Sequence, residues 1–85
     1  MPTAYVLINC DLGSEGDIIK KIKHVPEVIE VTNVSGVYDI IVRISADDMD
    51  KLRENIKSNI KKIDKVRSTI TMIVTEGQGQ KKIIK

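Results

Sequence analysis

The sequence contains no phenylalanine and no tryptophan, and its only aromatic residues are Tyr5 and Tyr38. Small sheet domains that read RNA usually stack bases on several aromatic side chains, so this sequence does not favour RNA binding. The single cysteine, Cys10, cannot close an internal disulfide, and with one histidine, His24, it provides too few ligands for a structural zinc site. We therefore expect neither a metal nor a cofactor, and a core of aliphatic side chains.

Other absences narrow the class of protein further. No apolar run approaches the ~20 residues needed to cross a bilayer, and no leader peptide is recognisable. Lys and Arg number 14 against 12 Asp and Glu, so the net charge is only +2 and does not indicate a dedicated DNA binder. Phosphate-binding glycine motifs and paired catalytic groups are also missing. These features predict a soluble, cytoplasmic domain that is not an enzyme.

The 85 residues suffice for one domain, and their patterning predicts six elements. Ser14 and Asp17 resemble a capping box, Pro26 should end the first helix, and Asp47 is a plausible cap for the second. The expected elements are strands over 3–10, 28–35, 38–45 and 66–76, and helices over 15–24 and 49–63.

This order predicts an α+β, ferredoxin-like βαββαβ fold: a four-stranded antiparallel sheet with two helices on one face. We assign residues 1–76 to this domain and expect residues 77–85 to form a flexible basic tail.

The sheet strands carry more apolar residues than one covered face can bury. Alternation along the last strand suggests that Val66, Ser68, Ile70, Met72 and Val74 face the helices. The uncovered face would then display Tyr5, Leu7, Ile41 and Ile73. An exposed apolar sheet face usually marks an association surface, so we expect a homodimer that forms through the sheet.

The segment between the two middle strands, Val34 to Asp39, stands out. Gly36 can adopt a positive φ, and free N–H groups in such a turn can hold a carboxylate, while Asp39 can accept hydrogen bonds from an ammonium group. The alternative is that Gly36 is only a turn glycine and Asp39 only caps the turn.

The same segment resembles a known pattern. Residues 31–39, Val-Thr-Asn-Val-Ser-Gly-Val-Tyr-Asp, are similar to the "V-x-x-V-[ST]-G-x-[YF]-D" turn of the Lrp/AsnC effector-binding domain, and residues 66–71, Val-Arg-Ser-Thr-Ile-Thr, are similar to its "V-x-x-T-x-T" strand. The resemblance implies a domain that dimerises through its sheet, assembles dimers into octamer-like rings, and binds free amino acids between dimers. Carried over by position, the ligand-binding residues would be Ser35, Gly36, Val37, Tyr38, Asp39, Thr69 and Thr71.

This chain also departs from the family pattern. It begins at the first strand, without room for a helix-turn-helix domain, so it resembles a stand-alone form and direct DNA binding is not expected. Residues 63–66 read Ile-Asp-Lys-Val where the family often has Leu-Pro-Gly-Val. We expect an amino-acid-sensing, oligomerising domain for transcriptional regulation of amino acid metabolism, which changes its assembly or pairs with full-length regulators. The alternatives are a ligand-free assembly scaffold and a small dimeric ferredoxin-like barrel enzyme.

Overall fold

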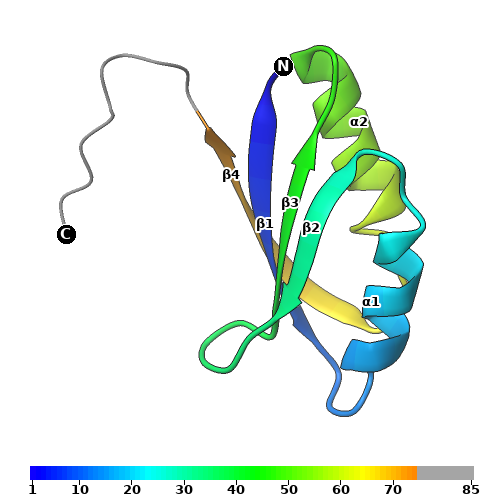
Figure 1. Ribbon diagram of the computed structural model, residues 1–85. Helices are drawn as coiled ribbons and strands as arrows, with labels where there is room; N and C mark the ends of the chain where they lie inside the picture. Colours follow the sequence, from blue (N-terminus) through cyan, green and yellow to red (C-terminus); the bar gives the residue numbers. More distant parts are fainter. Residues whose placement is uncertain (75–85) are drawn as a thin grey trace, which may run out of the picture.

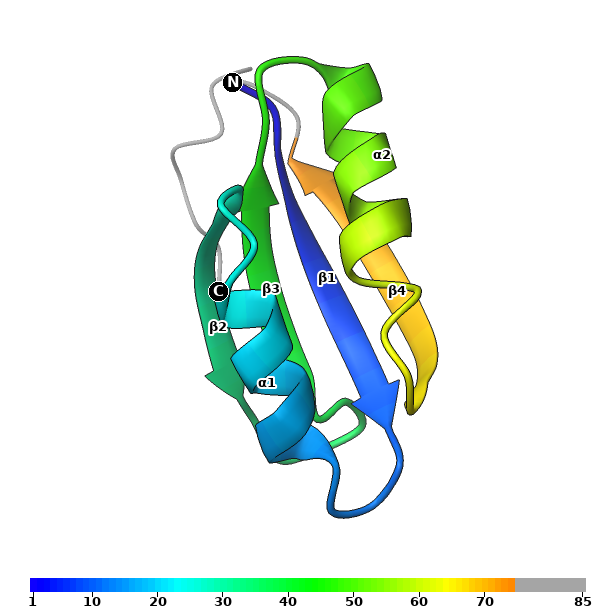
Figure 2. The same cartoon turned by 90° about the vertical axis from the view of Figure 1, so that its right-hand side faces the viewer.

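The computed structural model describes residues 1–74, and these form a four-stranded antiparallel sheet with two helices on one face (Figures 1 and 2). The predicted element order and fold class are confirmed. The predicted basic tail, residues 77–85, lies outside the described residues. The elements are β1 (Thr3–Cys10), α1 (Glu15–Lys23), β2 (Val28–Asn33), β3 (Ile40–Ser45), α2 (Met49–Asn59) and β4 (Val66–Val74).

Both helices begin at the predicted residues, Glu15 and Met49, but their capping interactions differ from the prediction. The Ser14 hydroxyl donates to the carbonyl of Asp11 at 2.6 Å and makes no cap hydrogen bond to α1, so no capping box forms. Asp48, rather than Asp47, caps α2, because its Oδ1 accepts a hydrogen bond from the Lys51 N–H at 2.8 Å. Helix α2 ends at Asn59, and Ile63 packs against the core from the segment that follows.

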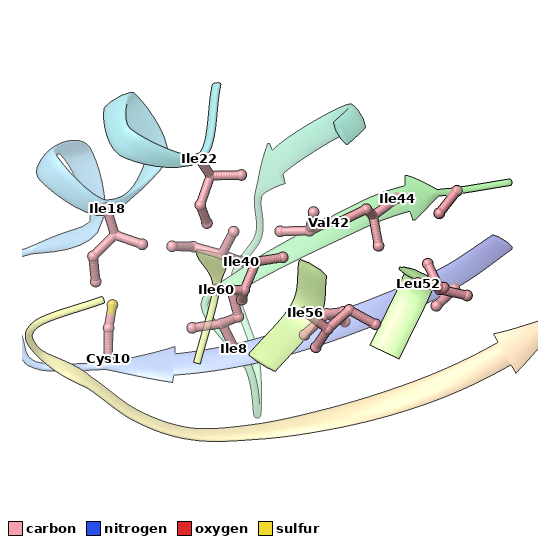
Figure 3. Close-up of a cluster of buried hydrophobic side chains, with 13 residues drawn as sticks. Ile8, Cys10, Ile18, Ile22, Ile40, Val42, Ile44, Leu52, Ile56 and Ile60 are labelled. Atoms are coloured by element: carbon pink, nitrogen blue, oxygen red, sulfur yellow. The ribbon is translucent and has the colours of Figure 1, made fainter. Parts of the chain in front are cut away.

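The strand order is β2-β3-β1-β4, which places β1 and β3 in the centre and β4 at one edge. Each neighbouring pair is antiparallel. Alternate residues of β1 and β3 point towards the helices, where they meet the apolar stripes of α1 and α2 (Figure 3). The buried core is aliphatic, as expected, and consists of Ala4, Val6, Ile8, Cys10, Ile18, Ile22, Ile40, Val42, Ile44, Ala46, Leu52, Ile56 and Ile60.

The predicted orientation of β4 is wrong beyond its first residue. Val66 packs against the core as expected, but β4 is irregular at Arg67: Cys10 pairs with Val66, whereas Asn9 pairs with Ser68. This bulge adds one residue to β4 and reverses the faces of the residues after it.

Consequently Thr69, Thr71 and Ile73 pair with the buried residues Ile8, Val6 and Ala4 and lie on the helix side. Ile73 therefore does not belong to the uncovered face of the isolated domain.

The uncovered face keeps Tyr5, Leu7 and Ile41 and gains Ile70, Met72 and Val74 from β4. Leu7 lies in the middle, with Ile41 opposite it on β3 and Ile70 opposite it on β4. Tyr5, Ile70, Met72 and Val74 retain between 38% and 50% of their accessible surface, so the patch is apolar and open to solvent. We call these six residues the open-face patch.

Candidate functional site

Asp39 is the last residue of the loop between β2 and β3, and three hydrogen bonds fix its position. Its N–H donates to the carbonyl of Ile8 at 2.9 Å, and its carbonyl accepts from the Val34 N–H at 2.8 Å. Its side-chain Oδ2 accepts from the Cys10 N–H at 3.0 Å. The carboxylate is therefore held where β1 ends, and its second oxygen, Oδ1, accepts no hydrogen bond from residues 1–74.

The Cys10 thiol lies beside this carboxylate, with its Sγ 3.8 Å from Asp39 Oδ2. Burial is the largest cause that raises the pKa of the Cys10 thiol; the hydrogen bond with Ser14 lowers this pKa, and the nearby carboxylates of Asp39 and Glu15 raise it, so that the net shift is upward. A thiol with a raised pKa stays protonated at neutral pH and is a poor nucleophile. Cys10 is therefore a poor candidate for a nucleophile, and its role beside Asp39 is to hold the carboxylate through its backbone N–H.

An open hollow of about 510 Å³ surrounds the Asp39 side chain and is lined by Asn9, Cys10, Asp39, Arg67 and Ser68. The β4 bulge brings Arg67 to this hollow, where its Nε lies 3.7 Å from Asp11 Oδ1 in a contact that leaves the Arg67 side chain 69% exposed. Residues that carry a carboxylate, a guanidinium, an amide and a hydroxyl therefore line a single hollow. These groups complement an ammonium and a carboxylate, the two charges of a free amino acid.

The structure separates the residues that the sequence grouped together. Asp39 lines the hollow, whereas Ser35, Gly36, Val37 and Tyr38 belong to the neighbouring loop and do not line it. Gly36 has a φ of +150°, which explains a glycine there. Val37 is 82% exposed at the loop tip.

The two β4 threonines lie on the helix side of the sheet and are absent from the lining of the hollow. Thr71 instead lines a different groove, beside α2.

Asn9, Cys10, Arg67 and Ser68 were not predicted as site residues. The element order offered one signal, because in this fold the end of the first strand lies beside the start of the last. The bulge that brings Arg67 into the lining has no recognisable sequence pattern.

The element order and the four-stranded antiparallel sheet define a small ferredoxin-like domain. A family model described as the Lrp/AsnC ligand-binding domain matches residues 3–80. The chain therefore belongs to the Lrp/AsnC ligand-binding domain family.

Similar proteins agree with this assignment. The HTH-type transcriptional regulator FL11 of Pyrococcus furiosus is 32% identical over 71 residues, which cover 84% of this chain and 46% of that regulator. The chain thus spans about half the length of the curated regulators it matches. A homocitrate synthase of Sulfurisphaera tokodaii is 37% identical over 57 residues, covering 67% of this chain and 12% of that enzyme.

Solved structures show the same architecture. FFRP-DM1 is 35% identical with a TM-score of 0.85, and the alignment covers 88% of this chain and all of that one. A hypothetical protein of Pyrococcus horikoshii, PHS023, is 31% identical with a TM-score of 0.84, and the alignment covers 98% of this chain and all of that one.

Two further observations concern the described part of the chain. Residues 1–74 contain no cluster of three or more His, Cys, Asp or Glu side chains that could hold a metal ion. None of the helices in this part is long and apolar enough to span a membrane.

Proposed function

We propose that this domain senses a free amino acid, which binds in the hollow between Asp39 and Arg67 and changes the way the domain assembles. The observation that carries the proposal is the unused Oδ1 of Asp39 in the same hollow as a largely exposed guanidinium. The ligand ammonium would pair with Asp39, and its carboxylate would pair with Arg67, with Asn9 and Ser68 as additional hydrogen-bond partners. The loop residues Ser35 to Tyr38 and the β4 threonines, Thr69 and Thr71, would contribute only from a second copy placed against this end of the sheet.

The lining also suggests which amino acids bind. Apart from Cys10, every side chain that lines the hollow within one copy is polar or charged. A polar hollow favours a ligand side chain that can hydrogen-bond, because an aliphatic side chain would leave those groups without partners. Amino acids with small or polar side chains should therefore bind more tightly than leucine, isoleucine or phenylalanine.

The open-face patch supplies the assembly half of the proposal. Six apolar side chains lie on one side of a four-stranded sheet and favour a two-fold homodimer. In such a dimer a single interface buries the same patch on both copies. A ligand that binds only the assembled form stabilises it by RT ln(1 + [L]/Kd). Through this linkage, amino acid concentration would control the balance between dimers and larger, octamer-like rings.

The regulatory output would be transcriptional and would concern amino acid metabolism, through pairing with full-length regulators of the same family. Support comes from the transcriptional regulators that carry a similar domain and from FFRP-DM1, whose solved chain is fully covered by the alignment. This domain could join the assemblies of longer relatives because it shares the fold of their ligand-binding domain.

A screen of the purified protein against the twenty amino acids, each at millimolar concentration, tests the proposal. Melting temperature and light scattering are recorded together. We expect a subset of polar amino acids to raise the melting temperature and change the mass of the assembly. A constant mass and melting temperature with all twenty would favour a ligand-free scaffold.

A second candidate function follows from the homocitrate synthase similarity. A related segment within an enzyme suggests that such domains also regulate catalysis, in which case this chain would bind an enzyme of amino acid synthesis and make it respond to the same ligand. Co-purification distinguishes the two functions: a tagged form of the chain would retain a synthase rather than a helix-turn-helix regulator.

A further inference from the structure

A second groove lies on the helix side of the sheet, between α2 and the outer strand β4. It measures about 600 Å³ and is lined by Arg53, Ile56, Lys57 and Lys61 from α2 and the segment after it, and by Thr71 and Ile73 from β4. Figure 2 shows α2 running alongside β4 at the edge of the sheet. Residues at the start of β4 line the hollow around Asp39, so the hollow and the groove use different parts of this strand.

The edge of β4 can pair with another strand. One side of β4 is hydrogen-bonded to β1, and within residues 1–74 no strand lies on its other side. An unpaired edge presents backbone N–H and C=O groups in the spacing of a sheet, and extended peptides bind to such edges as an additional strand. The groove lies on the helix side of this edge strand, between β4 and α2.

The rim of the groove is positively charged. Arg53, Lys57 and Lys61 follow one another at intervals of four residues, which places them along one side of the helix and its continuation. The ion pairs among residues 1–74 involve Arg43, Lys51 and Arg67, so none of the three rim cations is neutralised by a described carboxylate.

The interior of the groove combines apolar surface with one unsatisfied polar atom. Ile56 and Ile73 form its apolar floor. The Thr71 Oγ1 is buried and has no hydrogen-bond partner within residues 1–74. A buried hydroxyl without a partner is unfavourable, so this side of β4 is not fully satisfied in the isolated domain.

We propose that this groove binds an acidic segment of a partner protein, which adds to β4 in extended conformation. Strand addition would satisfy the backbone groups of the edge. Every second side chain would face the groove, where apolar residues would meet Ile56 and Ile73 and acidic residues would meet the cations of the rim.

Other occupants fit less well. The rest of this chain, residues 75–85, contains Lys81, Lys82 and Lys85 against one carboxylate, Glu76, and would bring more positive charge to the rim. A second copy paired through its own β4 across a two-fold axis would place two sets of the same cations close together. DNA would neutralise the cations but would use neither the strand edge nor the apolar floor.

The experiment uses a fluorescein-labelled nine-residue peptide of alternating glutamate and valine, titrated with the full chain and followed by fluorescence polarisation at low salt. Two control peptides replace all glutamates with lysine or place a proline at the centre, because proline cannot donate a strand hydrogen bond. We expect the acidic peptide to bind, the lysine peptide not to bind, and the proline peptide to bind at least tenfold more weakly. Amide hydrogen exchange of β4 should slow when the acidic peptide is bound.

Variants locate the binding site. Arg53→Glu and Lys57→Glu should each lower the affinity for the acidic peptide by at least tenfold. Lys20→Glu makes an equal charge change at an exposed position on α1 and should have little effect on this affinity. Circular dichroism confirms that each variant is folded.

The proposal is overturned if the Lys20→Glu variant weakens binding as much as Lys57→Glu, or if the proline peptide binds as well as the acidic one. It is also overturned if a 20-base-pair DNA duplex binds in the groove and the peptide does not. None of these outcomes depends on amino acid binding at Asp39.

Discussion

A polar substitution at Met72 should weaken the dimer proposed for the open face. Met72 lies opposite Tyr5 in the sheet and keeps 50% of its accessible surface in the isolated domain. Burying a methionine side chain fully is worth about 1.5–3 kcal/mol, so burying the exposed half should contribute about 0.8–1.5 kcal/mol. A two-fold interface contains Met72 twice, which brings the total to about 1.5–3 kcal/mol.

Replacement of Met72 by serine removes most of this contribution from each copy. Since about 1.4 kcal/mol corresponds to a tenfold change in an equilibrium constant, the dimer dissociation constant should rise about 10- to 100-fold. The fold of the monomer should persist, because Met72 is half exposed and lies outside the aliphatic core. Sedimentation velocity over a dilution series, with far-ultraviolet circular dichroism as a check on folding, measures both effects.

A matched control uses Leu12, which is 98% exposed in the loop between β1 and α1 and lies outside the open-face patch. Leu12→Ser removes more exposed apolar surface than Met72→Ser but should leave the dimer dissociation constant unchanged. An unchanged mass of Met72→Ser at every dilution, or a Leu12 variant that dissociates as readily as the Met72 variant, would show that the open-face patch does not form the dimer interface.

Three further predictions concern local structure and need only thermal or chemical unfolding. Lys65 has a φ of +75°, which costs a residue with a side chain about 1–2 kcal/mol. Lys65→Gly should therefore raise the unfolding free energy by a fraction of that amount. A decrease in the unfolding free energy would show that the Lys65 side chain makes a stabilising contact. Asp48→Ala should lower the unfolding free energy by about 1 kcal/mol through loss of the α2 cap, whereas Asp47→Ala should change it by much less, and equal effects would contradict the cap assignment. Thr71→Val should stabilise the free domain by up to about 1 kcal/mol, because the buried hydroxyl has no described partner, and a clear loss of stability would mean that this hydroxyl is hydrogen-bonded.

The element order could be predicted because each element has its own local signal. The apolar spacing of Ile18 and Ile22 identifies α1, and β-branched runs bounded by turns identify the strands. The loop between β2 and β3 is longer than expected, since the ladder stops at the pair Asn33 and Ile40 and the Asp39 side chain bonds to Cys10 instead. That contact joins residues 29 positions apart, so local sequence patterns cannot predict it.

The faces of β4 show a second limit of sequence analysis. Both alternating sets of β4 residues contain apolar side chains, so hydrophobicity alone does not decide between them, and the bulge at Arg67 reverses the assignment made from Val66. The same irregularity explains the incomplete site prediction. Asp39 could be identified from its turn, but Arg67 lines the hollow only because β4 and β1 are neighbours with a shifted register.

Calorimetric titration of the wild type and the Asp39→Asn variant tests most directly whether Asp39 binds the ammonium group of the ligand. Asparagine keeps an oxygen that can accept from the Cys10 N–H, so the loop geometry should survive while the charge is lost. With the amino acid that raises the melting temperature most, we expect Asp39→Asn to bind about 10- to 100-fold more weakly, as expected for the loss of a charged hydrogen bond worth about 1.5–3 kcal/mol. Arg67→Gln should weaken binding similarly. Equal affinity of the wild type and a folded Asp39→Asn variant would contradict the account.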